Sequence, residues 1–297
     1  MRNSPTFQLP LFKQNDLSRV VNVASVPFRS PFRYPGGKTW LVPRIRQWLL
    51  GKKEKPNLLV EPFAGGAIVG LTAAFERLAQ RVLLAERDPS VAAVWKTILN
   101  ADGEWLAERI VNFELTPRSV DAVLERDAST TRDLAFQTIL RNRVNRGGIL
   151  ADGAGRVKHG ENGKGLSSRW YPDTLRRRIL DIVQIRERIS IVEGDGILTI
   201  QENASRPDAV FFIDPPYTAA GKRAGRRLYT YSDLDHPQLF SIAAAIRGDF
   251  LMTYDTVEEI EELALQYGFD RESIAMKNTH HARMTELLIG PNLVWLR

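Results

Sequence analysis

The sequence predicts an α/β protein built on a mostly parallel sheet, with an antiparallel hairpin at its end and an inserted helical and hairpin module. Three observations predict this class. Short apolar runs alternate with amphipathic stretches, which is the pattern of parallel strands covered by helices. A long basic segment interrupts that pattern in the middle of the chain. The last two apolar runs lie too close together for a helix to connect them.

Five apolar runs each precede a turn or a helical stretch, and they are the predicted strands: residues 58–60, 82–85, 189–192, 209–213 and 250–252. Apolar residues with helical spacing predict helices over 69–78 and 91–99. Gly290-Pro291-Asn292 separates the final runs, 287–289 and 293–296, and this turn chemistry predicts the terminal hairpin.

The chain divides into three predicted regions. Residues 1–30 are interrupted by prolines and form an N-terminal extension with little regular structure. Residues 31–101 and 186–297 form the main domain, and residues 102–185 form the inserted module. Within 141–178, ten Lys and Arg stand against three acids, a net charge of +7, which exceeds the +6 of the whole chain. A basic excess gathered in one segment indicates a polyanionic partner.

The composition excludes several classes of protein. With 43% hydrophobic and 26% charged residues, the chain has a globular balance, and its lack of cysteine excludes disulfide frameworks, zinc–thiolate sites, iron–sulfur clusters and a cysteine nucleophile. No apolar run approaches the roughly 18 residues of a spanning helix, and the first 20 residues lack the apolar core of a signal peptide. We therefore expect an intracellular, cytoplasmic protein. The four histidines have no ligand-like spacing, so we predict no metal site.

Asp214-Pro215-Pro216-Tyr217, directly after the predicted strand 209–213, is the sharpest chemical motif. A planar exocyclic amine such as N6 of adenine attacks an electrophile only when acceptors draw its hydrogens aside. A carboxylate and a carbonyl held by a diproline supply such acceptors, and the tyrosine offers a face for an unstacked base. The alternative is a strand that ends in ordinary Asp-Pro turn chemistry, which remains open for the tetrapeptide alone.

A second motif, Glu61 to Gly66, follows the strand 58–60 and begins a helix. Its glycines let the backbone approach a ligand, and its carboxylate can pair with a cationic amino group. Glu86 ends the next strand about 20 residues later, where an acid accepts hydrogen bonds from ribose hydroxyls. Individually these signals are weak, and the alternative is an ordinary tight turn between a strand and a helix. Together they describe a nucleoside-binding half.

Two nucleotide-binding alternatives fit less well. The turn reads Gly65-Gly66-Ala67 in place of G-x-G-x-x-G, so a pyrophosphate cradle is not supported. Gly37-Lys38-Thr39 is similar to the end of a phosphate-binding loop, but that loop needs a glycine where this chain has Phe32. A nucleoside triphosphatase is therefore disfavoured.

The motifs together resemble those of the Dam-like family, the DNA adenine N6-methyltransferases of the D12 class with the α order of motifs. The resemblance rests on Arg33 to Lys38, Glu61 to Gly66 and Asp214 to Tyr217, and it extends over roughly residues 30–297. It implies a methyltransferase sheet of Rossmann-like type that binds S-adenosyl-L-methionine (SAM). It also implies that 102–185 is the target-recognition module.

The resemblance implies roles for individual residues. Residues matching SAM contacts in such enzymes are Tyr34, Lys38, Glu61, Phe63, Gly65, Glu86, Asp195 and Asp214. Asp214, Pro215, Pro216 and Tyr217 match the catalytic motif, in which the aspartate acts on the amino group and the tyrosine stacks on the flipped base.

The resemblance also places DNA contacts in the basic regions. In the recognition module the candidates are Arg143, Asn145, Arg146 and Ile149, because arginine and asparagine can read base edges and an apolar side chain can wedge between base steps. The basic loop after the catalytic motif adds Lys222, Arg223, Arg226 and Arg227. Contact with phosphate alone, or simple solvation of a loop, remains an alternative for these side chains.

The sequence therefore predicts a site-specific, SAM-dependent methyltransferase that acts on N6 of an adenine flipped out of double-stranded DNA. The chain would be a monomer in solution, associated with the nucleoid through DNA. Two alternatives stay open: an enzyme that methylates the amino group of cytosine N4 or of an RNA base, and a catalytically silent DNA-binding relative.

Overall fold

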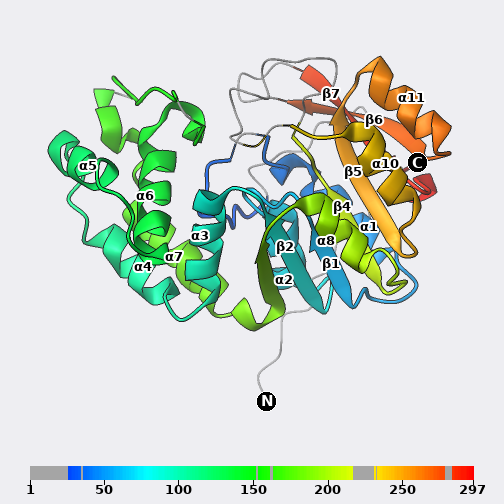
Figure 1. Cartoon of the computed structure of the whole chain (residues 1–297), viewed down its shortest axis with the longest axis horizontal. Coiled ribbons are helices and arrows are strands. Elements are labelled where there is room, and N and C mark those ends of the chain that lie inside the picture. Colours follow the sequence, from blue (N-terminus) through cyan, green and yellow to red (C-terminus); the bar gives the residue numbers. More distant parts are fainter. Residues whose placement is uncertain are drawn as a thin grey trace.

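The computed structural model describes residues 26–34, 36–151, 153–160, 163–216, 231, 233–277 and 283–297. Their strands form a seven-stranded sheet in the order β3-β2-β1-β4-β5-β7-β6 (Figure 1). The strands are β1 (Leu58–Glu61), β2 (Arg81–Glu86), β3 (Ile189–Glu193), β4 (Ala209–Ile213), β5 (Asp249–Asp255), β6 (Asp270–Lys277) and β7 (Arg283–Gly290). Strands β1 to β5 pair in parallel, while β7 runs antiparallel to both β5 and β6. The predicted fold class is confirmed.

Helices cover both faces of this sheet. They are α1 (Val42–Leu50), α2 (Ile68–Glu76), α3 (Pro89–Leu99), α4 (Gly103–Val111), α5 (Pro117–Leu124), α6 (Thr131–Val144), α7 (Pro172–Val183), α8 (Gly196–Asn203), α10 (His236–Ala244) and α11 (Glu258–Gln266). Alternate residues of β4 show the two layers: Val210 and Phe212 pack with α1, α2 and α3, whereas Phe211 packs with α8, α10 and α11. All five β4 residues are buried, as expected for a central parallel strand.

Aspartates start three of the helices near the carboxyl ends of the strands. Asp88 caps α3, Asp195 caps α8 and Asp235 caps α10, each by accepting a backbone N–H within three residues at 2.8 Å. Such N-caps satisfy donors that a helix cannot pair internally. The caps thereby collect acidic side chains at the edge of the sheet where ligands bind in open α/β folds.

The terminal hairpin has different strands from those predicted. Residues 287–289 do lie in β7, but Val294–Leu296 is a 3₁₀ helix, and the partner of β7 is β6. The apolar residues of β6 are confined to Ile274-Ala275-Met276, which follow four polar residues, and no turn or helical motif after them marked this run as a strand. Leu293 and Leu296 are buried without joining the sheet, which explains why their apolar character was misleading.

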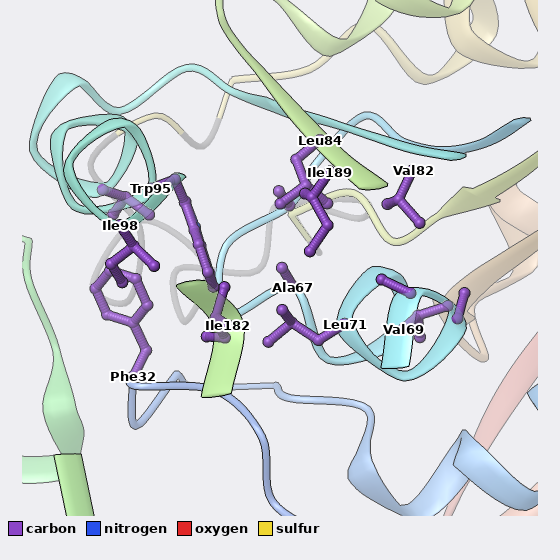
Figure 2. Close-up of a cluster of buried hydrophobic side chains, with 14 of the residues drawn as sticks. Phe32, Ala67, Val69, Leu71, Val82, Leu84, Trp95, Ile98, Ile182 and Ile189 are labelled. Atoms are coloured by element: carbon purple, nitrogen blue, oxygen red, sulfur yellow. The ribbon is translucent and has the colours of Figure 1, made fainter. Parts of the chain in front are cut away.

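Helices α4 to α7 lie beyond α3 in the part of the chain predicted to be an inserted module (Figure 1). One hydrophobic cluster runs from the sheet through α3 into these helices. Figure 2 shows part of it, where Trp95 and Ile98 of α3 lie near Phe32 and Ile182. The rings of Phe32 and Trp95 are 5.6 Å apart between centroids. The predicted boundaries at 102 and 185 stay a prediction, because the buried core is continuous across them.

The part of the predicted N-terminal extension that the structure describes, residues 26–30, contains no helix or strand. Val26 is nevertheless buried against Val42 of α1 and Ile68 of α2. Residues 1–25 lie outside the described residues. Among the described helices, none is long and apolar enough to cross a membrane.

Candidate active site

A cavity of about 440 Å³ opens at the carboxyl ends of β1, β2, β3 and β4. The structure brings ten of the predicted site residues together around it: Tyr34, Lys38, Glu61, Phe63, Gly65, Glu86, Asp195, Asp214, Pro215 and Pro216. Tyr217, the last residue of the catalytic motif, lies outside the described residues. The volume is in the range of small-molecule sites.

Asp214, at the end of β4, is held in place from two sides. The Lys38 Nζ lies 2.9 Å from its Oδ1, and the Thr253 hydroxyl of β5 donates to the same oxygen at 2.7 Å. The Asp214 side chain is 22% exposed, whereas that of Lys38 is 4% exposed. The carboxylate is therefore fixed by buried groups while part of it remains accessible from the cavity.

The Lys38 ammonium has three protons to donate, and its contacts include two carboxylates and a backbone carbonyl. Besides Asp214, its Nζ donates to the Gly36 carbonyl at 2.9 Å and lies 3.0 Å from Oε1 of Glu286 on β7. The Glu286 side chain is as buried as that of Lys38. A buried ammonium needs such partners, because desolvation disfavours an isolated charge. Lys38 thus joins the loop before the 3₁₀ helix Thr39–Leu41 to two strands.

The glycine-rich turn after β1 is shaped by close approaches to its neighbours. Gly65 has φ +46°, and a Cβ there would lie 2.6 Å from the Tyr34 ring. Its N–H donates to Oε2 of Glu86 at 2.8 Å, and its carbonyl accepts from the Trp95 indole at 2.9 Å. Only glycine combines this backbone conformation with that ring contact. The turn and Tyr34 therefore form one wall of the cavity.

Burial changes the ionisation of the two glutamates at the ends of β1 and β2. It raises the pKa of Glu61 to about 8, with nearby Asp214 adding to the rise and the Gly70 N–H opposing it. It raises the pKa of Glu86 to about 7, against hydrogen bonds from the Asp88 and Gly65 N–H groups. Such pKa values, well above those of exposed carboxyls, are typical of functional sites.

Asp195 also lines the cavity, at the start of α8. Its Oδ1 accepts from the Ile197 N–H at 2.8 Å, and its Oδ2 lies 3.7 Å from Arg87 Nη1. The Arg87 guanidinium in turn lies 5.4 Å from the centre of the Tyr231 ring. A Cβ on the following residue, Gly196, would lie 2.3 Å from the Pro62 carbonyl, so the start of α8 sits directly against the turn after β1.

The residues around the cavity fit SAM. Each carboxylate oxygen has two lone pairs, so Glu86 can still accept hydrogen bonds from ribose hydroxyls while it holds the turn. Glu61 lies where it can accept from a cationic amino group, and Phe63, Ile197 and Tyr34 provide apolar and aromatic lining. Among the described residues, no group of three or more His, Cys, Asp or Glu side chains is arranged to hold a metal ion.

The predicted DNA contacts of the module occupy different environments. Arg143 is buried, and its Nη2 donates to the Pro31 carbonyl. Asn145 is also buried and donates to the Ile149 carbonyl at 2.9 Å. Arg146 is exposed and Ile149 is half-buried. Only Arg146 therefore presents a largely exposed side chain in this structure, and DNA contact by all four stays a prediction. Lys222, Arg223, Arg226 and Arg227 lie outside the described residues.

A family model described as D12 class N6 adenine-specific DNA methyltransferase matches residues 34–119. The resemblance to this family is confirmed. The matched stretch includes Lys38, the glycine-rich turn and Glu86, and it ends before Asp214. The D12 match supports methyl transfer as the activity and SAM as the cofactor.

Solved structures give more distant likenesses. A SAM-dependent methyltransferase from Agrobacterium tumefaciens is 10% identical with a TM-score of 0.39; the match covers 84% of this chain, which spans 61% of the length of that protein. An rRNA methyltransferase from Streptomyces viridochromogenes is 15% identical, with coverage of 87% and 86% and a TM-score of 0.39. A precorrin-6y C5,15-methyltransferase from Geobacter metallireducens is 10% identical, with coverage of 87% and 91% and a TM-score of 0.37. Comparison with curated proteins found no match.

Sequence reasoning missed Thr253 as a site residue and gave Glu286 no role. Both are buried polar residues that adjoin apolar runs: Thr253 follows Phe250-Leu251-Met252, and Glu286 precedes Leu287-Leu288-Ile289. A charged residue within a buried strand is uncommon unless it is paired. A polar residue beside an apolar run was therefore the available signal in the sequence. The partners, Asp214 for Thr253 and Lys38 for Glu286, could be identified only from the fold.

Proposed function

We propose that this protein transfers a methyl group from SAM to N6 of an adenine flipped out of duplex DNA. The observation that carries the proposal is the position of Asp214-Pro215-Pro216. This segment borders the same cavity as the glycine-rich turn, Glu86 and Asp195. A base amino group held at Asp214 would therefore lie beside a nucleoside-binding site.

When bound, SAM supplies an electrophilic methyl group on its sulfonium. The Asp214 carboxylate accepts a hydrogen bond from the adenine amino group and orients the nitrogen lone pair away from the ring plane. Its negative charge also stabilises the positive charge that develops on the nitrogen. Lys38 and Thr253 hold the carboxylate before the substrate arrives, so little reorganisation is needed during the reaction.

Other residues would hold the cofactor. Glu86 accepts hydrogen bonds from the ribose hydroxyls, Asp195 lies where it can accept from the adenine amino group, and Tyr34 packs along the wall formed with Gly65. Lys38 contributes through the carboxylates that it contacts. Glu61 lines the cavity and would give up its proton beside the cationic amino group of the cofactor, because that positive charge lowers the pKa that burial raises to about 8.

A cluster of arginines supports a polyanionic substrate. Burial, together with the nearby charges of Arg178, Arg33 and Arg169, lowers the pKa of Arg143 to about 9. In the described part of the chain, the Arg143 Nε has no hydrogen-bond partner, and no ion pair involves Arg33 or Arg178. Clustered guanidinium groups favour phosphate oxygens, which accept their hydrogen bonds and neutralise their charge.

This basic cluster is joined to the cavity through the backbone. The Asn142 side chain of α6 accepts from the Arg33 N–H at 2.9 Å and donates to the Arg33 carbonyl at 3.0 Å. The next residue, Tyr34, lines the cavity. A nucleic acid bound at the arginines would therefore lie close to the site where a base is modified.

The direct test incubates the protein with SAM that carries an isotopically labelled methyl group and, in parallel reactions, with a duplex DNA library or an RNA pool. Nuclease digestion and mass spectrometry then identify the methylated nucleoside. We expect N6-methyladenine. N4-methylcytosine, or label incorporated only into RNA, would overturn the proposed substrate. SAM binding without turnover on any nucleic acid would instead favour the catalytically silent relative.

A further inference from the structure

Glu286 lies on β7, far in sequence from the motifs that line the cavity, yet it contacts the ammonium group that holds Asp214. Thr253 pairs with Leu288 across β5 and β7, so Thr253 and Glu286 lie on the same face of the sheet. Asp214 follows Ile213, whose strand partner Met252 precedes Thr253. The antiparallel part of the sheet thus supplies two side chains to the site at the end of β4.

The three charged groups form an unequal cluster. The Lys38 ammonium lies 2.9 Å from Oδ1 of Asp214 and 3.0 Å from Oε1 of Glu286, so one cation contacts two carboxylates. Glu286 therefore adds a second negative charge next to the Lys38–Asp214 pair. The side chains of Lys38 and Glu286 are each 4% exposed, so water screens these charges little.

We propose that Glu286 is a positioning residue that adds negative charge to the Lys38–Asp214 pair, and that this added charge makes the cavity prefer a cationic sulfonium over a neutral thioether. The inference rests on the proposed function, in which the methyl donor lies beside Asp214. SAM and its product S-adenosylhomocysteine differ in the methyl group and in the positive charge on sulfur. An additional negative charge at that point strengthens binding of the donor relative to the product and favours product release.

The role of Glu286 differs from that of Thr253. The Thr253 hydroxyl contributes a hydrogen bond to Asp214 but no charge, so it affects the orientation of the carboxylate. Glu286 contributes charge through Lys38. Variants at Thr253 and Glu286 therefore distinguish the effect of the orientation of the Asp214 carboxylate from the effect of the charge near it.

The test compares dissociation constants for sinefungin, which carries a cationic amine in place of the methylsulfonium, and for S-adenosylhomocysteine, both by isothermal titration calorimetry. In Glu286→Gln we expect the preference for sinefungin to fall by about fivefold or more, as for a charge lost from a poorly screened site. We also expect a lower kcat with little change in the KM for DNA. Thr253→Val should lower kcat and keep the wild-type preference. Glu286→Asp should largely restore the preference.

Two controls keep the test decisive. Glu262→Gln removes an exposed carboxylate from α11 and should leave kcat and the preference unchanged. Lys38→Met combined with Glu286→Gln removes one positive and one negative charge, so the net charge around Asp214 equals that of the wild type. The preference should then return toward the wild-type value even if Glu286→Gln alone does not fold. A loss of preference in this double variant contradicts the charge argument.

A wild-type preference in Glu286→Gln overturns the inference, whatever its kcat, and leaves the proposed function intact. A wild-type protein that binds neither ligand overturns the proposed function and the inference together. Equal weakening of both ligands in Glu286→Gln indicates a purely structural role and also overturns the inference.

Discussion

The cavity at the strand ends and the basic region around α6 and α7 are organised in opposite ways. Around the cavity, charges of opposite sign are paired, and glycines such as Gly65 and Gly196 are in close contact with their neighbours. In the basic region, like charges surround Arg143, and a Cβ at Gly153 or Gly163 would have no atom within 4 Å. The cavity therefore already has the paired charges and close packing that suit a small ligand. The basic region has excess positive charge and open space, which a large anionic partner would fill.

The strongest test of the cavity is Asp214→Asn, which keeps the shape of the side chain and removes its charge. We expect kcat to fall by about a thousandfold, within the range for loss of a group that acts on the reacting atom. The melting temperature should change little, because Asn can still accept from Thr253 and Lys38. Asp208→Asn, at a half-buried position before β4 that does not line the cavity, is the control for kcat. A variant at Asp214 with wild-type kcat would contradict its assigned role.

The difference in packing between the regions is tested by Gly65→Ala and Gly153→Ala. Both glycines have positive φ, but only at Gly65 does the new Cβ meet a side chain, 2.6 Å from the Tyr34 ring. We expect Gly65→Ala to lose about 2–4 kcal/mol of stability and most of its SAM affinity, and Gly153→Ala to lose about 1 kcal/mol from backbone strain alone. Denaturant unfolding and calorimetric titration measure the two effects. Equal losses of stability and of SAM affinity in the two variants would contradict the difference in packing between the two regions.

The basic region is tested by Arg143→Met, with Arg118→Met on the exposed surface of α5 as the control. If Arg143 contributes to a phosphate site, the variant should bind duplex DNA more weakly, and the slope of log K against log salt should decrease by about 1. Arg118→Met should keep the wild-type slope. An unchanged slope in Arg143→Met, measured on folded protein, would limit Arg143 to its bond with the Pro31 carbonyl.

The smallest expected effect concerns pH and Glu61. Burial raises the pKa of Glu61 to about 8 in the folded chain, from 4.5 for the ordinary group. The folded state therefore binds the proton more tightly, and this contribution to stability is full below pH 4.5 and is lost as the pH rises through 8. In Glu61→Gln, the melting temperature of the ligand-free protein should decline less between pH 5 and pH 8 than in the wild type. Exposed Glu54→Gln should follow the wild type; an unchanged decline in Glu61→Gln would contradict the assignment.

Much of the fold could be predicted because the parallel strands are continuous apolar runs that end in motifs. The run Ala209–Ile213 is one example, since it is followed directly by Asp214. Strand β6 was not predicted, because this edge strand begins with four polar residues and its apolar run, Ile274-Ala275-Met276, is not followed by a chemical motif. The role of Glu286 also depended on the fold, because its partner Lys38 is 248 positions away and no local pattern connects them.

The burial of Arg143 could not be predicted from the sequence either. Helix α6 is rich in polar residues, and Asn142 and Arg143 occupy its last turn, where charged residues are usually solvated. In the structure both side chains instead bind the backbone of residues 31–33. The residue types were sufficient to predict a basic region, but not which of its arginines are exposed.

The two hydrogen bonds between Asn142 and Arg33 have a practical consequence for engineering. If residues 102–185 were replaced by the corresponding segment of a relative, these hydrogen bonds would be lost unless the relative's counterpart of residues 31–34 were transferred as well. Because Tyr34 fills the space beside Gly65, a mismatch at Arg33 would also disturb the wall of the cavity. The unit to exchange is therefore discontinuous in sequence: residues 102–185 together with residues 31–34.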